Sequence, residues 1–270
     1  MPNLSSPNAR SSNYSGFLIF LALLLITAGT AYLFSGRIWF PAPTSSYARE
    51  IDRQFQIAFR VLGSLFIAGQ FFLGVVLLRS RKASSARGSR PLEIAWALLI
   101  ASLFFWFNVA SNRLWSQIKL HDPEEDALHV EVTGTQFQWY FRYPGPDGQF
   151  GRTNPQRFSK PEEGNPLGID PEDHDGQDDI VSTSLVLPAN HDVDLILRAN
   201  DVIHGLFIPA MRFKQDAVPG MTTHARFKPL QTGTYELACS QLCGLGHYRM
   251  RASVEIVTGE KFNEWLKSAH

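Results

Sequence analysis

The fold of this chain is constrained most by three apolar segments, all of which lie before residue 112. They cover residues 16–34, 61–78 and 94–109, and each is close to the roughly 20 residues that an α-helix needs to cross a hydrocarbon core. Inside a bilayer the backbone polar groups must be paired within the segment, so such runs form helices. The sequence therefore predicts an N-terminal transmembrane anchor, residues 1–112, of two or three α-helices.

The orientation of the anchor follows from its basic residues. The connection between the second and third segments is the densest basic stretch of the chain, and it contains Arg79, Arg81, Lys82, Arg87 and Arg90. Loops rich in Lys and Arg stay on the cytoplasmic side of a membrane. We therefore expect the polar segment after the third helix, residues 120–270, to lie outside the cytoplasm.

The first apolar segment allows two interpretations. A polar leader with Arg10 precedes it and small residues such as Ala28 and Gly29 lie within it, which is typical of a cleaved signal peptide. Its length favours a retained helix instead. Both alternatives leave residues 120–270 outside the cytoplasm.

The polar segment has the pattern of an all-β sandwich. Short alternating stretches are separated by Gly, Pro, Asn and Asp, as in strands joined by turns. The predicted strands cover residues 128–132, 185–187, 193–197, 233–238 and 254–257. The loops of such a sandwich are suitable places for a binding site.

A stretch rich in Pro, Gly and Asp, residues 143–180, interrupts these strands without clear periodicity, and we expect it to be a long inserted loop. Residues 121–180 contain 14 Asp and Glu against 4 Lys and Arg. Such an acidic face can steer a basic partner, or it can simply be solvated surface. The whole chain has a formal net charge of zero, which gives no indication of nucleic acid binding.

Two cysteines, two histidines and a methionine form the most distinctive chemical pattern. Cys239, Cys243, His247 and Met250 follow one another closely, and His204 precedes them. Thiolate, imidazole and thioether groups are soft to borderline donors, which suit copper far better than magnesium or calcium. The sequence therefore predicts a copper site.

The second cysteine bears on the number of copper ions. One Cys, two His and a weak axial Met are enough for a single blue-copper ion. Two thiolates on one loop can instead bridge two ions, which leaves one histidine for each and Met250 as a weak ligand of one. Gly244 and Gly246 allow a tight turn that returns His247 toward the thiolates. The backbone carbonyl of Gln241 is a candidate for a further ligand.

Two other chemistries use the same residues. Cys239 and Cys243 could form a disulfide in an oxidising compartment, but this leaves the clustered His and Met unexplained. A Cys2His2 zinc site is the other alternative, and zinc has no need of Met250.

These motifs resemble subunit II of the cytochrome c oxidases. The similarity rests on the block from Cys239 to Met250 and on four upstream motifs, Asp201-Val-Ile-His204, Ile208-Pro209, Lys214-Gln-Asp216 and Val218-Pro219-Gly220. It is strongest over residues 185–257, and the anchor matches more loosely.

The resemblance implies a cupredoxin-like fold and a dinuclear CuA centre. Its ligands would be the side chains of His204, Cys239, Cys243, His247 and Met250 and the backbone carbonyl of Gln241. The chain would then be the electron-entry subunit of a respiratory haem-copper oxidase in a bacterial plasma membrane, with its C-terminal domain periplasmic. Electrons would come from a cytochrome c and pass to subunit I, and subunit III is a further expected partner. Oxygen reduction belongs to the complex, and this chain alone is an electron relay.

The resemblance also points to two sites outside the copper pattern. In the family an aromatic stretch accepts electrons from cytochrome c, and here a gap-free match places Phe137 at the position of the entry tryptophan. Trp139 follows two residues later and is our candidate, with a packed strand aromatic as the alternative. Glu93, three residues before Trp96, resembles a position linked to proton entry, and a simple helix-start carboxylate is its alternative.

Two departures from the family matter. A glutamate usually lies between the two cysteines and binds a magnesium ion at the subunit interface, so Gln241 makes a magnesium role doubtful. The first apolar segment and residues 143–180 are additional, which indicates a divergent bacterial branch. A CuA subunit of a nitric oxide reductase and a non-catalytic copper-binding assembly protein are the alternative functions. Subunits of quinol oxidases have lost the copper ligands, which this chain keeps.

Overall fold

The computed structural model describes residues 8–35, 41–79, 88–120, 124–159 and 163–269. The described residues divide into two compact units. The first, here called the anchor, contains residues 8–35 and 53–112, and the second, here called the head, contains residues 41–52 and 113–269. Each unit has its own packing, and the two are described separately below.

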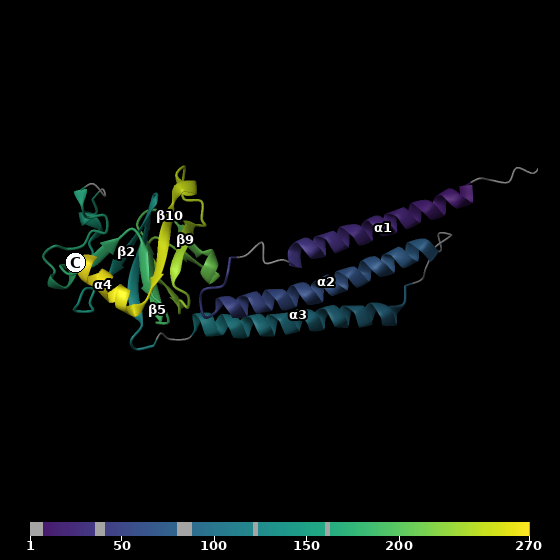
Figure 1. The fold of residues 1–270 in the computed structure, drawn as a ribbon, viewed down its shortest axis with the longest axis horizontal. Helices are drawn as coiled ribbons and strands as arrows, with labels where there is room; N and C mark the ends of the chain where they lie inside the picture. The colour runs from purple at the N-terminus through teal and green to yellow at the C-terminus, as the bar shows by residue number, and fades with distance from the viewer. Residues whose placement is uncertain (1–7, 36–40, 80–87, 121–123, 160–162, 270) are drawn as a thin grey trace, which may run out of the picture. The chain divides into compact units, whose positions relative to one another are not determined.

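The anchor is formed by three long helices, α1 (Asn8–Ser35), α2 (Ala48–Arg79) and α3 (Arg90–Lys119) (Figure 1). The first turn of α2 and the last turns of α3 belong to the head. All three are long and apolar enough to cross a membrane, which confirms the predicted apolar helices. Most of their large apolar side chains are exposed, as expected for surfaces that face lipid. The predicted cytoplasmic residues Arg81, Lys82 and Arg87 lie outside the described residues, so the orientation stays a prediction.

Close contacts join neighbouring helices of the anchor. The rings of Phe20 on α1 and Phe71 on α2 lie 6.1 Å apart. A side chain at Gly74 would overlap the Phe20 ring, so glycine is what allows α1 to approach α2 at this level. Gln54 on α2 donates a hydrogen bond to the hydroxyl of Ser111 on α3.

The head is a sandwich of two five-stranded sheets. The first has the strand order β3-β2-β1-β5-β8, with β1 (Leu128–Thr135), β2 (Gln138–Tyr143), β3 (Ile180–Ser182), β5 (Val193–Ala199) and β8 (Thr223–Phe227). The second has the order β4-β10-β9-β6-β7, with β4 (Leu185–Pro188), β6 (His204–Ile208), β7 (Phe213–Ala217), β9 (Gly233–Cys239) and β10 (Arg251–Val257). The pairs β1·β5 and β4·β10 are parallel, and the other pairs are antiparallel.

The core lies between the two sheets, where alternate residues of the strands point inward. Val130 and Val132 of β1 are fully buried, as are Leu195 and Leu197 of β5, its parallel neighbour. This alternation is what the sequence pattern required of a sheet with one face in the core. The predicted all-β, cupredoxin-like sandwich is confirmed.

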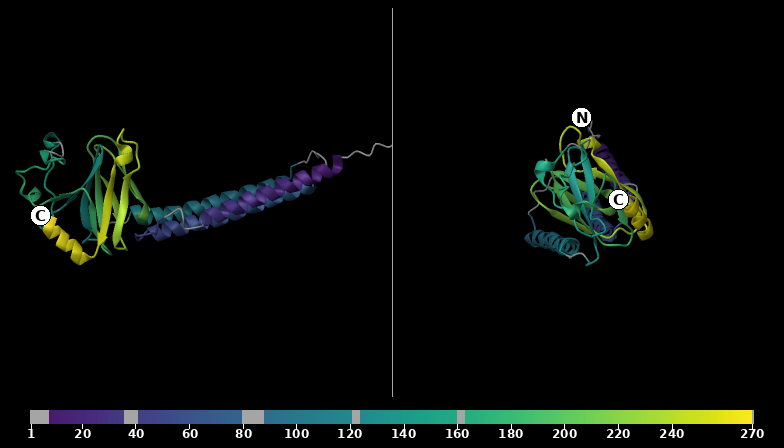
Figure 2. Two further views of the ribbon diagram at one scale, coloured as in Figure 1. Left: turned by 45° about the horizontal axis from the view of Figure 1, so that its top comes forward. Right: turned by 90° about the vertical axis from the view of Figure 1, so that its left-hand side faces the viewer.

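A C-terminal helix that was not predicted, α4 (Gly259–Ala269), lies against the sandwich and is drawn in yellow in Figure 2. Phe262 is buried, and the ring of Trp265 meets the ring of Tyr143 edge-on at 4.9 Å. The Tyr143 hydroxyl donates to the carbonyl of Val186 at 2.9 Å. Burial raises the pKa of the Tyr143 phenol far above its usual value, so this donor stays protonated.

The segment that leads into α2 is part of the head. The Thr44 N–H donates to the carbonyl of Ala210 at 2.9 Å, and the Thr44 carbonyl accepts from Leu230 N–H at 2.7 Å. Asp52 forms an ion pair with Arg212 at 2.7 Å. The sequence assigned all of residues 1–112 to the anchor, whereas this segment packs with the head.

The acidic insert is held by a buried arginine. Arg142 of β2 is 1% exposed and donates to Glu131 at 2.9 Å, to Asp179 at 2.9 Å and to the carbonyl of Gly151 at 2.6 Å. Burial raises the pKa of Asp179, although Arg142 opposes that shift. Within its described residues the insert contains the short 3-10 turns η2 (Pro155–Arg157) and η4 (His174–Gly176), in keeping with the expected long loop.

Candidate metal centre

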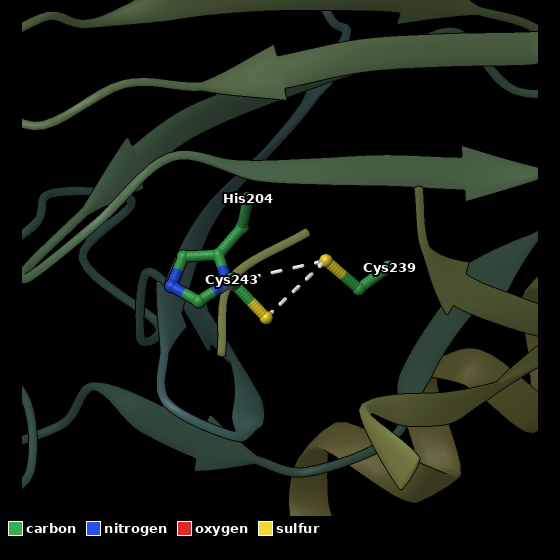
Figure 3. A group of neighbouring side chains, drawn as sticks. All are labelled: His204, Cys239 and Cys243. Carbon is green, nitrogen blue, oxygen red and sulfur yellow. Dashed lines mark hydrogen bonds between the residues drawn. The ribbon is translucent and has the colours of Figure 1, made fainter. Parts of the chain in front are cut away.

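Three predicted ligands from separate parts of the head converge in its interior (Figure 3). His204 begins β6 and is fully buried, Cys239 ends β9, and Cys243 lies in the loop after β9. Leu206 pairs with Cys239 across the sheet, which brings the start of β6 beside the end of β9. The His204 Nδ1 lies 4.0 Å from the Cys239 sulfur, and the two sulfurs lie 3.9 Å apart.

The sulfur separation fits shared metal ions rather than a disulfide. Both cysteines are free, and 3.9 Å is far longer than the about 2.05 Å of a disulfide bond. Two metal–thiolate bonds of about 2.3 Å each to one ion can span this distance. The arrangement therefore permits Cys239 and Cys243 to bind the same ion or ions.

The remaining predicted ligands surround the same two sulfurs. His247 Nδ1 lies 3.6 Å and Met250 Sδ 3.8 Å from the Cys243 sulfur. The Cys239 thiol donates to the Gln241 carbonyl at 3.2 Å. The structure thus brings together all six groups, and a set of two thiols, two imidazoles, a thioether and a carbonyl fits copper.

Asp201 orients His204, a role that the sequence alone did not assign. The Nε2 of His204 lies 2.8 Å from the Asp201 carboxylate, so its Nε2–H donates there and Nδ1 is left to face the sulfurs. Asp201 also accepts the N–H of Gln136 at 2.7 Å. Burial would raise the pKa of Asp201, but these hydrogen bonds lower it overall. The position of Asp201, three residues before the predicted ligand His204, was the one feature of the sequence that could have indicated this role.

Replacing Asp201 by alanine is expected to weaken copper binding about 10-fold to 100-fold, because partners that orient a ligand histidine typically matter by this much. The measurement is competition for copper against a chelator of known affinity. Glu172→Ala, which removes an exposed acid of the insert, is the control and should bind copper like the unchanged chain. Equal affinity in both variants would contradict the role of Asp201.

The Cys243 thiol holds its proton when no metal is bound. Burial, together with the neighbouring Cys239, raises the pKa of the Cys243 thiol to about 11. A thiol must lose its proton to become a metal ligand, so metal binding here releases protons. Soft metal ions that compete well with protons for sulfur are favoured at such a site.

The turn between β1 and β2 supports the loop that carries the cysteines. The Gln136 side chain donates to the carbonyl of Cys243. Side-chain atoms at Gly244 or Gly246 would press against the Phe137 ring, and Gly244 has a φ of 135°, which favours glycine. Phe137 is half-buried by this contact.

The other predicted site residues lie in different surroundings. Trp139 is fully buried, and its ring meets that of His204 edge-on at 5.8 Å. Trp139 is therefore beside a ligand but has no surface that a donor protein can touch. Glu93 lies in the first turn of α3 with an exposed side chain, where a carboxylate is favourable to the helix dipole. The roles of Trp139, Phe137 and Glu93 stay predictions.

Large apolar side chains project from the cysteine loop. Leu242 is 85%, Leu245 98% and Tyr248 71% exposed. Exposed apolar residues gathered on one short loop are typical of a protein interaction surface. No motif in the sequence pointed to these residues.

Comparison with known proteins gives a consistent result. Residues 128–257 match the family model described as cytochrome c oxidase subunit II, periplasmic domain. The alternative cytochrome c oxidase subunit 2 of Bradyrhizobium diazoefficiens is 35% identical, over 92% of this chain and 90% of that protein. Cytochrome c oxidase subunit 2 of Thermostichus vulcanus is 27% identical, over 84% of this chain and 77% of that protein.

One similar solved structure is the periplasmic domain of subunit II of cytochrome oxidase from Bradyrhizobium japonicum. The alignment covers 54% of the present chain and 95% of the solved domain, at 28% identity and a TM-score of 0.40. The 35% identity to the Bradyrhizobium diazoefficiens protein extends over nearly the full length of both chains and shows the family. The chain belongs to the cytochrome c oxidase subunit II family, and with it to the haem-copper oxidases.

Proposed function

We propose that this chain is the electron-entry subunit of its oxidase, with a dinuclear CuA centre in the head. The ligands in this proposal are the side chains of His204, Cys239, Cys243, His247 and Met250 and the carbonyl of Gln241. The observation that carries it is the second thiol, because Cys239 lies 3.9 Å from Cys243 in a site where one cysteine would be enough for a single copper ion.

Copper bound here would supply one-electron redox chemistry, and the chain's own residues would make the exchange fast. His204 and Met250 are fully buried, which keeps water away from the centre. Asp201 fixes the His204 ring, and Gln136 fixes the loop carbonyl at Cys243. A site held this firmly changes little in geometry when its charge changes, and small reorganisation is what an electron relay requires.

The exposed residues of the cysteine loop and the acidic insert support a protein partner for electron delivery. Leu242 and Leu245 offer apolar contact directly beside the ligands, and the net negative insert suits a basic donor such as a cytochrome c. In this proposal electrons pass on to the haem-bearing subunit I, and subunit III completes the complex. The three apolar helices would lie in a bacterial plasma membrane with the head on the periplasmic side.

The decisive test is electron paramagnetic resonance with copper quantitation on the purified full chain in detergent. The full chain is the right sample because residues 41–52 pack with the head. Two coppers per chain and a seven-line mixed-valence signal are expected. One copper with an ordinary four-line signal would show a mononuclear site, and zinc in place of copper would show a structural one.

Electron delivery by a basic cytochrome c should slow as salt is added. Raising ionic strength from about 10 mM to 150 mM shortens the Debye length from about 30 Å to about 8 Å, so steering by exposed acids weakens. We expect the second-order rate constant of reduction to fall roughly 10-fold. A small uncharged reductant is the control and should show no salt dependence. A flat salt profile with cytochrome c would rule out steering by the insert.

A further inference from the structure

The side chain of Gln241 has a partner outside the loop that carries it. Its amide Nε2 donates to the carboxylate Oδ2 of Asp216, on β7, at 2.7 Å. The other oxygen of that carboxylate, Oδ1, is buried and accepts no hydrogen bond from the described residues. The Gln241 amide is therefore the hydrogen-bond partner on which the Asp216 carboxylate depends.

The main chain beside Gln241 is fixed at the same level of the sheet. The Ser240 N–H donates to the carbonyl of Gly205 at 2.9 Å, and Gly205 pairs with Asp216 in the register of β6 and β7. A side chain at Gly205 would overlap the Ser240 hydroxyl and would lie 3.1 Å from both Asp216 Oδ1 and Gln241 Cγ. Residues 205, 216, 240 and 241 thus form one tightly packed layer next to the ligand His204.

We propose that Asp216 is a positioning residue of the metal centre, which acts through the Gln241 side chain. With the side chain held by Asp216 and the preceding N–H held by Gly205, the Gln241 carbonyl is directed at the Cys239 sulfur, 3.2 Å away. The inference rests on the proposed function, in which this carbonyl is a copper ligand. Asp216 itself touches no copper ligand atom in this assignment.

The pair also explains how the chain can have glutamine at this position. A glutamate at 241 would place a second carboxylate within hydrogen-bond distance of Asp216, where two like charges repel unless a proton or a cation lies between them. The magnesium that the family holds through that glutamate does not fit here, because the Gln241 amide is neutral and its N–H is turned to Asp216. The amide–carboxylate hydrogen bond holds the loop without a divalent cation.

Four variants of the full chain in detergent test this positioning role. Asp216→Leu removes the acceptor and should make copper loss to a chelator about 10-fold faster, within the range for partners that orient ligands, and should change the copper hyperfine splitting. Asp216→Asn keeps an acceptor and should behave like the unchanged chain. Gln241→Glu should match Asp216→Leu. The double variant Gln241→Glu with Asp216→Asn reverses the hydrogen bond and should restore both readouts.

Manganese chloride tests whether repulsion between two carboxylates is what weakens copper binding in the Gln241→Glu variant. It should slow copper loss from the Gln241→Glu variant, where two carboxylates face each other, and leave the unchanged chain unaffected. Lys214→Ala, an exposed residue of the same strand, is the matched control and should alter neither readout.

The outcomes distinguish the two proposals. A chain that never shows the two-copper signal contradicts the proposed function. A normal two-copper signal in Asp216→Leu, with unchanged splitting and copper loss, overturns the role of Asp216 alone. Failure of the double variant to recover while Asp216→Asn stays normal also overturns it.

Discussion

Replacing Cys239 by serine should abolish the mixed-valence copper signal and reduce copper from two ions per chain to one or none. Serine keeps the size of the side chain but replaces a soft, bridging sulfur by a hydroxyl that remains protonated at neutral pH. The groups left behind, Cys243, His247, Met250 and His204, are those of a mononuclear copper site. Electron transfer from cytochrome c should fall by at least about 100-fold, a loss of about 2.7 kcal/mol or more in barrier terms.

The measurements for this variant are paramagnetic resonance, copper quantitation and stopped-flow reduction of the full chain. His174→Ala is the control, because His174 lies in the η4 turn of the insert, away from the copper loop in the sequence. It should keep two coppers and the full rate. If both variants lose the signal equally, the ligand assignment is wrong, and if Cys239→Ser keeps two coppers, Cys239 is not a bridge.

The sequence predicted those helices and strands in which the order of apolar and polar residues along the chain reflects which side chains are buried. β1 and β5 carry apolar residues at alternate positions because one face lies in the core. The three helices were predicted because each contains an apolar run long enough to cross a membrane. β6 (His204–Ile208) was missed because its sequence, His-Gly-Leu-Phe-Ile, does not alternate apolar and polar residues. β7 (Phe213–Ala217) was missed because its middle, which includes Asp216, is polar.

The ligands could be predicted because their residue types are chemically rare and closely spaced. The residues that position these ligands were not predicted, because most of them, such as Gln136 and Asp216, come from a distant strand or turn. Asp201 at least lies three residues before His204, whereas no local pattern gives Asp216 a role at the metal centre, and only the pairing of β6 with β7 and β9 brings Asp216 to Gln241. The packing of residues 41–52 with the rest of the head likewise depends on contacts between residues far apart in the sequence, which the periodicity of apolar residues cannot predict.

The same limit applies to Arg142, which sequence analysis counted as one of four basic residues in an acidic region. In the structure its guanidinium is buried and joins β1, β2 and the insert through Glu131, Asp179 and the Gly151 carbonyl. A buried charge network of this kind is strongly destabilised when one member is removed, because its partners stay buried without compensation. Arg142 therefore joins the insert to β1 and β2 through one buried side chain.

Replacing Arg142 by leucine should destabilise the head by about 3–5 kcal/mol, because Asp179 then stays buried without its cation and Glu131 keeps only its ion pair with Arg198 at 3.2 Å. For a unit of this size, that corresponds to a melting temperature roughly 10 °C lower, measured by circular dichroism on the copper-free full chain. Arg152→Ala is the matched control, since the Arg152 side chain is 76% exposed and its ion pair with Asp173 contributes little. Its melting temperature should change by no more than about 2 °C. Arg142→Lys keeps the charge but loses the planar guanidinium that reaches three acceptors. Its melting temperature should lie between those of Arg142→Leu and Arg152→Ala. A melting temperature for Arg142→Leu equal to that of Arg152→Ala would show that the insert is held by other contacts.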